Sequence, residues 1–166
     1  MRLWPMLAFG ALVGLAVVLL WPSPPTRAPA EPVRARPEQQ AATVLRAWDD
    51  QRARAWAEGD TVALARLYVA TAPAREVDVR MLRRWVARGV RVQGLAMQVL
   101  SLRVLDHADG WWRLRVTDRV ASADLVAPGR ETELIDPEKP PGAARTRVLE
   151  LRETRGTWQM VSVKDA

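Results

Sequence analysis

The chain has 166 residues, which predicts one folded domain with room for a terminal appendage. It contains no cysteine and a single histidine, so disulfides, thiolate metal sites and cysteine nucleophiles are excluded, and we expect no metal and no cofactor. Of the net charge of +6, half lies in residues 1–36, and the remainder of the chain holds 21 basic and 18 acidic residues. The folded part is thus nearly balanced in charge, and no nucleic acid is expected as a partner.

Residues 3–21 form a run of 19 residues without a charged side chain. As a helix this run is roughly 28 Å long, close to the roughly 30 Å hydrocarbon core of a bilayer. Trp4 and Trp21 bracket it as interfacial aromatic residues do. We therefore predict a transmembrane signal anchor over residues 1–21. The alternative is a cleaved signal peptide ending near Ala30, which would make the protein secreted.

The positive charges on the two sides of this run do not decide its orientation, but the very short N-terminal tail favours an extracytoplasmic C-terminal domain. We expect a single-pass protein of the cell membrane. Residues 22–37 contain six prolines and are predicted to be a semi-extended linker. The linker leads into a domain over residues 38–166.

The apolar residues of this domain change period midway. Up to residue 89 they recur every three or four positions, and from residue 90 they alternate. The first pattern predicts helices over 38–57, 61–68 and 76–88, bounded by Gly59, Asp60 and Gly89. The second predicts strands over 90–105, 111–126, 146–153 and 158–164, with a proline-containing loop before the third. This order indicates an α+β fold with three helices packed on a curved antiparallel sheet.

The stretch AWDDQRARAWAEGD, residues 47–60, places two tryptophans around a pair of aspartates and two arginines. Asp49 and Asp50 are adjacent, and neighbouring helical residues point about 100° apart, so these carboxylates cannot share a proton as a catalytic dyad. Trp48 and Trp56 fall on the apolar stripe of the helix. We interpret both as packing residues.

Arg52 falls inside the same apolar stripe. A buried guanidinium stays charged and needs a carboxylate or carbonyl partner. Asp118 and Asp124 lie on one face of the second predicted strand and are the candidate partners. The open alternatives are a structural ion pair and a place in a pocket that meets a polar or anionic ligand.

The third predicted helix carries Arg80, Arg84 and Arg88 at four-residue spacing. Such a stripe is typical of a solvated face, here partly neutralised by Glu76 and Asp78, and less often of a phosphate or membrane contact.

Trp111 and Trp112 point to opposite faces of one strand, so at least one faces away from the helices. An exposed tryptophan on a sheet favours an interface, and we expect a possible homodimer or protein partner at the open sheet face.

The order of elements, and the passage WAEGDTVALARLY from Trp56 to Tyr68, resembles the nuclear transport factor 2-like (SnoaL-like) superfamily. The stretches AWDDQRARAWAEGD, DVRMLRRWVARGVRV and VTDRV look like membrane-anchored or secreted proteins of high-GC actinobacteria. The resemblance covers residues 38–166 and implies a cone-shaped domain. The superfamily includes isomerases, cyclases, dehydratases and structural modules, so the resemblance leaves the function open.

In isomerase-like cones a tyrosine and an aspartate act as hydrogen-bond donor and general base. The resemblance offers Tyr68 and Asp118 for these roles, although Tyr68 also fits a helix end with its hydroxyl at the surface and Asp118 fits an ion pair. We therefore assign no catalytic residue. The candidates for lining a cone pocket are Trp48, Arg52, Trp56, Tyr68 and Asp118.

The sequence favours a membrane-anchored, extracytoplasmic binding or assembly module without enzymatic activity. The alternatives are a small-molecule isomerase or cyclase that uses Asp118 and Tyr68, and a secreted ligand carrier. A solvent-open pocket lined by these two residues and Arg52 favours the enzyme or the carrier. A cone filled by tryptophan and leucine side chains excludes both.

Overall fold

The computed structural model describes residues 36–127, 130–133 and 142–166, which belong to one compact unit. The predicted membrane anchor, nearly all of the linker and most of the proline-containing loop lie outside these residues. Within the described ranges, no helix is long and apolar enough to cross a bilayer.

The described residues form three helices, α1 (Pro37–Glu58), α2 (Thr61–Arg66) and α3 (Pro73–Ala87). Gly59 ends α1 in the left-handed conformation with φ of 71°, which glycine adopts without a steric penalty. Asp60 then caps α2 by accepting hydrogen bonds from two backbone N–H groups of its first turn. Both boundaries agree with the sequence prediction. Helix α3 begins three residues earlier than predicted, because proline is well tolerated in the first turn.

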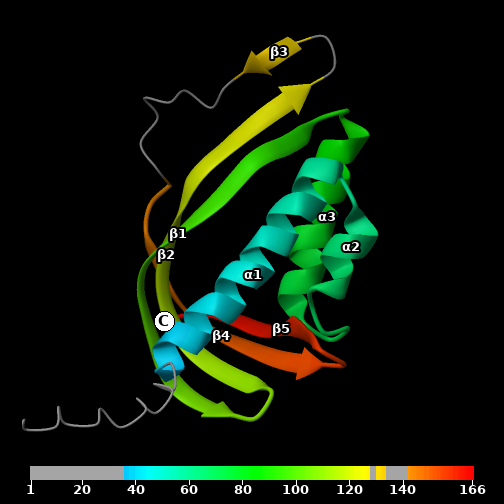
Figure 1. Cartoon of the computed structure of the whole chain (residues 1–166). Coiled ribbons are helices and arrows are strands. Elements are labelled where there is room, and N and C mark those ends of the chain that lie inside the picture. The colour runs from blue at the N-terminus through cyan, green and yellow to red at the C-terminus, as the bar shows by residue number, and fades with distance from the viewer. Residues whose placement is uncertain (1–35, 128–129, 134–141) are drawn as a thin grey trace, which may run out of the picture. The chain divides into compact units, whose positions relative to one another are not determined.

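The strands of the described residues form one antiparallel sheet: β1 (Arg91–Ala108), β2 (Trp111–Ala127), β3 (Arg130–Glu133), β4 (Arg145–Thr154) and β5 (Thr157–Asp165). The order is β1-β2-β4-β5, and β3 pairs with the far end of β2. Figure 1 shows α1 crossing the inner side of the curved sheet, with α2 and α3 beside it. The α+β class is confirmed. Strand β3 was not predicted, since its four residues lie in the segment expected to be a loop.

The core lies between α1 and the inner face of the sheet, which β2 builds from alternating buried residues (Trp112, Leu114, Val116 and Asp118). Helix α1 contributes the predicted stripe of Ala41, Leu45, Trp48, Ala55 and Trp56. The indole N–H of Trp48 donates to the carbonyl of Leu67 at 2.9 Å, so this buried polar group is satisfied.

The segment after α2 is fixed to the edge of the sheet. The backbone N–H of Val69 donates to the carbonyl of Met160 at 3.0 Å, and that of Met160 donates to Leu67 at 2.8 Å. Tyr68 lies between them, buried, with its ring edge-to-face against Trp48 at 5.4 Å. This backbone pairing sets the position of the Tyr68 hydroxyl.

Candidate functional site

A pocket of about 740 Å³ lies between α1, α3 and the inner face of the sheet. Its walls are largely apolar, with Leu45, Met97, Leu149, Met160 and Val163 among the lining residues. The pocket reaches the surface beside Val77, Met81 and Val120, whose side chains are exposed. Its size and its apolar walls are typical of a small-molecule site.

One side of the pocket is built on Asp78 of α3. Its carboxylate accepts two hydrogen bonds from Arg52 of α1, at 2.7 Å from Nε and 2.8 Å from the terminal nitrogen, and a third from the hydroxyl of Tyr68 at 2.7 Å. The Asp78 side chain is 8% exposed and that of Arg52 22%. This is a fork-to-fork ion pair with an added phenol donor, the geometry in which a buried charge is well compensated.

The partner of Arg52 corrects the sequence analysis in two respects. The expected partners were Asp118 and Asp124, but the guanidinium binds Asp78, which was assigned to a solvated helix face. Asp78 stands four residues before the buried Leu82, so it shares that residue's face of α3 and points inward. That spacing was the available signal. The hydroxyl of Tyr68 is likewise buried on Asp78 rather than at the surface.

The cluster shifts the pKa of Tyr68 and of Arg52. Burial raises the pKa of the Tyr68 phenol, and the negative charge of Asp78 raises it further. Burial disfavours the charged form of Arg52, but its hydrogen bond to Asp78 and that carboxylate's charge outweigh this effect, so the pKa of Arg52 lies above its usual value. Tyr68 therefore stays protonated and donates a hydrogen bond to Asp78, and Arg52 stays positively charged.

A second ion pair joins two strands on the sheet side of the pocket. Asp118 of β2 is buried and is bound by a terminal nitrogen of Arg147 of β4. Both residues line the pocket. Asp118 thus has a strong partner of its own, which leaves less of its carboxylate free for other chemistry.

Asp49 is the exception among the carboxylates of the pocket. It lines the pocket and is half-buried, yet it makes no hydrogen bond and no ion pair with any residue that the structure describes. Burial raises the pKa of Asp49 from 3.8 to about 6, although the positive charges of Arg52 and Arg147 act in the opposite direction. Its neighbour Asp50 is exposed. Among the described residues, Asp49 is therefore the pocket carboxylate that lacks a hydrogen-bond or ion-pair partner.

The five predicted pocket residues are not all in the same place. Trp48, Arg52, Tyr68 and Asp118 line the pocket, and Trp56 is not among its lining residues. Trp56 is buried in the core, where its ring lies 5.7 Å from the guanidinium carbon of Arg52. Within the described ranges, no group of three or more histidine, aspartate or glutamate side chains is arranged to hold a metal ion.

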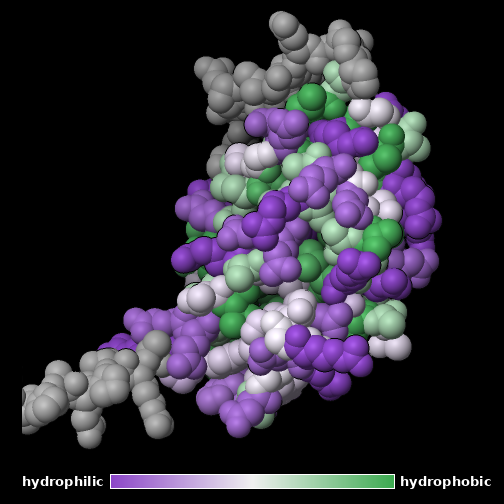
Figure 2. Space-filling model, turned by 45° about the vertical axis from the view of Figure 1, so that its right-hand side comes forward, coloured by the Kyte–Doolittle hydropathy of each residue, from purple (hydrophilic) through white to green (hydrophobic). Residues whose placement is uncertain are grey.

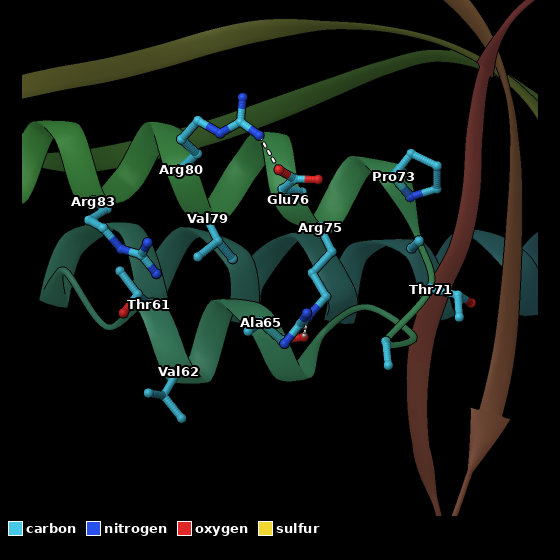
Figure 3. A pocket seen from close by; sticks show the side chains of 12 residues that line it. Thr61, Val62, Ala65, Thr71, Pro73, Arg75, Glu76, Val79, Arg80 and Arg83 are labelled. Atoms are coloured by element: carbon cyan, nitrogen blue, oxygen red, sulfur yellow. Dashed lines mark hydrogen bonds and ion pairs between the residues drawn. The ribbon is translucent and has the colours of Figure 1, made fainter.

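A second hollow, of about 800 Å³, lies on the outer side of α2 and α3 (Figure 3). Its arginines are used in local contacts or face solvent: Arg80 pairs with Glu76, and Arg75 donates to the carbonyl of Ala65 at 3.3 Å. The side of the domain brought forward in Figure 2 is mostly hydrophilic, with hydrophobic residues in small groups. This hollow holds no buried, unpaired titratable group among the described residues, so the inner pocket is the stronger candidate site.

No protein-family model and no curated protein matches the chain. Similar solved structures include the intermembrane space region of the chloroplast protein ARC6, with 15% identity and a TM-score of 0.46 over 79% of this chain and 98% of that one. Aln2 from Streptomyces sp. has 11% identity and a TM-score of 0.49 over 78% and 93%. A protein with a cystatin-like fold from Caulobacter vibrioides has 12% identity and a TM-score of 0.42 over 75% and 87%. At such TM-scores these likenesses support no inference about function.

Proposed function

We propose that this chain is a ligand-binding module that holds a small molecule in the pocket between α1, α3 and the sheet. The observation that carries the proposal is the pocket, with its volume of about 740 Å³ and walls in which apolar side chains stand beside a set of charged ones. Small-molecule sites combine these features. The side chains expected to fill the cone leave this space open: Trp48 stands at the wall, while Trp56 and Leu114 pack in the core.

Two ion pairs hold the pocket in a fixed form. The Arg52–Asp78 pair, with the Tyr68 hydroxyl, connects α1, the segment after α2 and α3. The Asp118–Arg147 pair connects β2 to β4. Side chains that are already held in place lose little entropy when a ligand binds, so a prebuilt pocket favours affinity.

We place this module at the membrane surface. The uncharged run over residues 3–21 would anchor the chain, and the proline-rich residues 22–37 would hold the domain away from the bilayer on the extracytoplasmic side. A secreted carrier, released by cleavage near Ala30, is the other form of the same proposal. The order of three helices and an antiparallel sheet in the described residues supports membership of the nuclear transport factor 2-like superfamily.

A protein contact through the outer sheet face is a separate proposal. Trp111 is half-buried on the β2 face opposite the buried Trp112, next to the exposed Arg113. An aromatic anchor with a charged rim is a common plan for an interface. Sedimentation of the detergent-solubilised chain tests it: we expect Trp111→Ala to shift a dimer to monomer, and a monomeric wild type at micromolar concentration would count against it.

A small-molecule enzyme is the second candidate, and Asp49 is the observation that favours it. An unpaired pocket carboxylate with a pKa of about 6 suits a general base. Tyr68 and Asp118 already have strong partners, so proton transfer through Asp49 is easier to support. Conversion of a bound molecule by the wild type, and its loss in Asp49→Asn, would identify an enzyme.

The binding proposal is tested by screening small apolar and amphipathic molecules against the full chain by thermal shift and ligand-observed NMR. Ala143 lines the pocket and is exposed, so Ala143→Trp should obstruct the pocket without disturbing the core. Ala144 is exposed but does not line the pocket, and Ala144→Trp is the matched control. We expect Ala143→Trp to abolish binding that Ala144→Trp retains. A screen without a binder, or binders equally tolerant of both changes, would contradict the proposal.

A further inference from the structure

The aspartates of the pocket differ in their partners. Asp49, Asp78 and Asp118 line it together with four arginines, Arg52, Arg119, Arg145 and Arg147. Arg52 binds Asp78 through two nitrogens, and Arg147 binds Asp118. The carboxylate of Asp49 is left over, with one negative charge that no described residue pairs.

The remaining charged groups near this carboxylate do not pair with it. Asp50 follows it on α1, is exposed and carries the same sign. Arg119 and Arg145 also line the pocket, but Arg145 is exposed and the Nε of Arg119 donates to Gln98 at 2.7 Å. Gln98 is exposed as well, so water and salt screen both guanidinium groups. Among the described residues, the carboxylate of Asp49 is thus the pocket aspartate that has no partner, and it favours a positively charged ligand.

We propose that the pocket takes a small amphipathic amine, whose ammonium group pairs with Asp49 and whose apolar body fills the rest of the pocket. This inference rests on the proposed binding function and names the class of its ligand. An ammonium group supplies three donors and the missing charge, and a charge-assisted hydrogen bond to a partly desolvated carboxylate is stronger than a neutral one. A neutral ligand would leave Asp49 unpaired, and an anion would meet a like charge.

The mouth of the pocket fits the apolar part of such a ligand. Val77 is 58% exposed, Met81 45% and Val120 39%, and all three line the pocket. Met97 of β1 stands directly across from Val120 in the sheet. Exposed apolar side chains at the mouth of a pocket are typical of a contact surface. Methionine side chains are flexible, so they can pack against ligands of different shape.

The pairing makes binding depend on pH in a defined direction. The amine must be protonated, which it is below about pH 10, and Asp49 must be ionised, with its pKa of about 6 in the empty pocket. Affinity should therefore rise through pH 6 and stay level to pH 8. Between pH 5 and pH 7.5 the ionised fraction of such a carboxylate changes about tenfold, which is the expected change in affinity.

Calorimetry on the full chain in detergent tests this inference with three probes of one size: 2-phenylethylamine, 2-phenylethanol and 3-phenylpropionate. We expect the amine to bind at least tenfold more tightly than the other two at pH 7.5. Asp49→Asn should remove this preference and its dependence on pH. Asp50→Asn, which removes an exposed charge one residue away, should leave both unchanged. Circular dichroism melts show that each variant is folded.

The outcomes separate this inference from the binding function. If the alcohol or the carboxylate binds as tightly as the amine or more tightly, and Ala143→Trp weakens this binding, the proposal of an amine ligand is refuted. The pocket then remains a binding site. An amine preference that survives Asp49→Asn, or that is lost in Asp50→Asn, would also overturn it. If none of the three probes binds, the proposal of an amine ligand is refuted. The proposed binding function is refuted as well only if the wider screen also finds no binder.

Discussion

Replacement of Asp78 by asparagine is the sharpest test of the buried cluster beside the pocket. The change preserves the size of the side chain and removes the charge that compensates Arg52, whose side chain is 22% exposed. Removal of one partner from a buried ion pair costs about 3–5 kcal/mol. We expect about 3 kcal/mol, because Arg52 retains some contact with water and the amide oxygen still accepts from Tyr68. A domain of this size has a stability of about 5–15 kcal/mol, so the loss is large.

Urea denaturation of the full chain in detergent, followed by tryptophan fluorescence, measures this loss. Glu76→Gln is the matched control: it breaks the Arg80–Glu76 pair on the same helix, where the side chains are 54% and 75% exposed. Exposed pairs contribute roughly 0–1 kcal/mol, so this variant should stay close to wild type. The double change Arg52→Met with Asp78→Leu should be more stable than Asp78→Asn. Equal losses for Asp78→Asn and Glu76→Gln would refute the view of Arg52 as a buried cation that depends on Asp78.

Three further predictions concern single residues. Burial raises the pKa of Asp49 to about 6, so between about pH 4 and pH 6 the native state binds more protons than the unfolded state and loses stability as the pH rises. In urea titrations, Asp49→Asn should therefore be about 1–2 kcal/mol more stable than wild type at pH 8 and equal to it near pH 4. Asp60→Ala removes the cap of α2 and should cost about 1 kcal/mol in the same assay, and an unchanged midpoint would deny the cap a role. Gly59→Ala strains a residue with φ of 71° and would place its Cβ 2.7 Å from Nε of Arg91, so its melting temperature should fall further than that of Gly156→Ala, where the new Cβ meets nothing within 4 Å.

Most of the α+β architecture could be read from local patterns. Helical and alternating periods leave distinct traces in a sequence, and Gly59 and Asp60 mark a helix boundary through their own backbone and side-chain chemistry. Strand β3 leaves no such trace. Its partner residues in β2 are close in the sequence, with Ala127 opposite Arg130, but four residues between prolines are too few to show a period.

The partner of Arg52 shows where local patterns stop being informative. A charged residue in an apolar stripe indicates that a partner exists, but its identity depends on how α3 packs beside α1. The sequence analysis considered Asp118 and Asp124, but this packing brings Asp78 within 2.7 Å. The spacing in α3 agrees with this pairing, because a carboxylate four residues from the buried Leu82 lies on the buried face of the helix.

Asp49 follows from the same geometry that excludes the dyad. Adjacent helical residues point about 100° apart, so of two neighbouring aspartates one reaches solvent and the other the pocket. This separation prevents the two carboxylates from sharing a proton, but it leaves Asp49 free to face the pocket on its own. An unpaired, partly desolvated carboxylate destabilises the empty domain above about pH 6, and departures from local rules are expected at functional sites. Burial weakens the stabilisation of the ionised carboxylate by water. The proposed cationic ligand would stabilise this charge again by pairing with it, and the free energy gained would contribute to affinity.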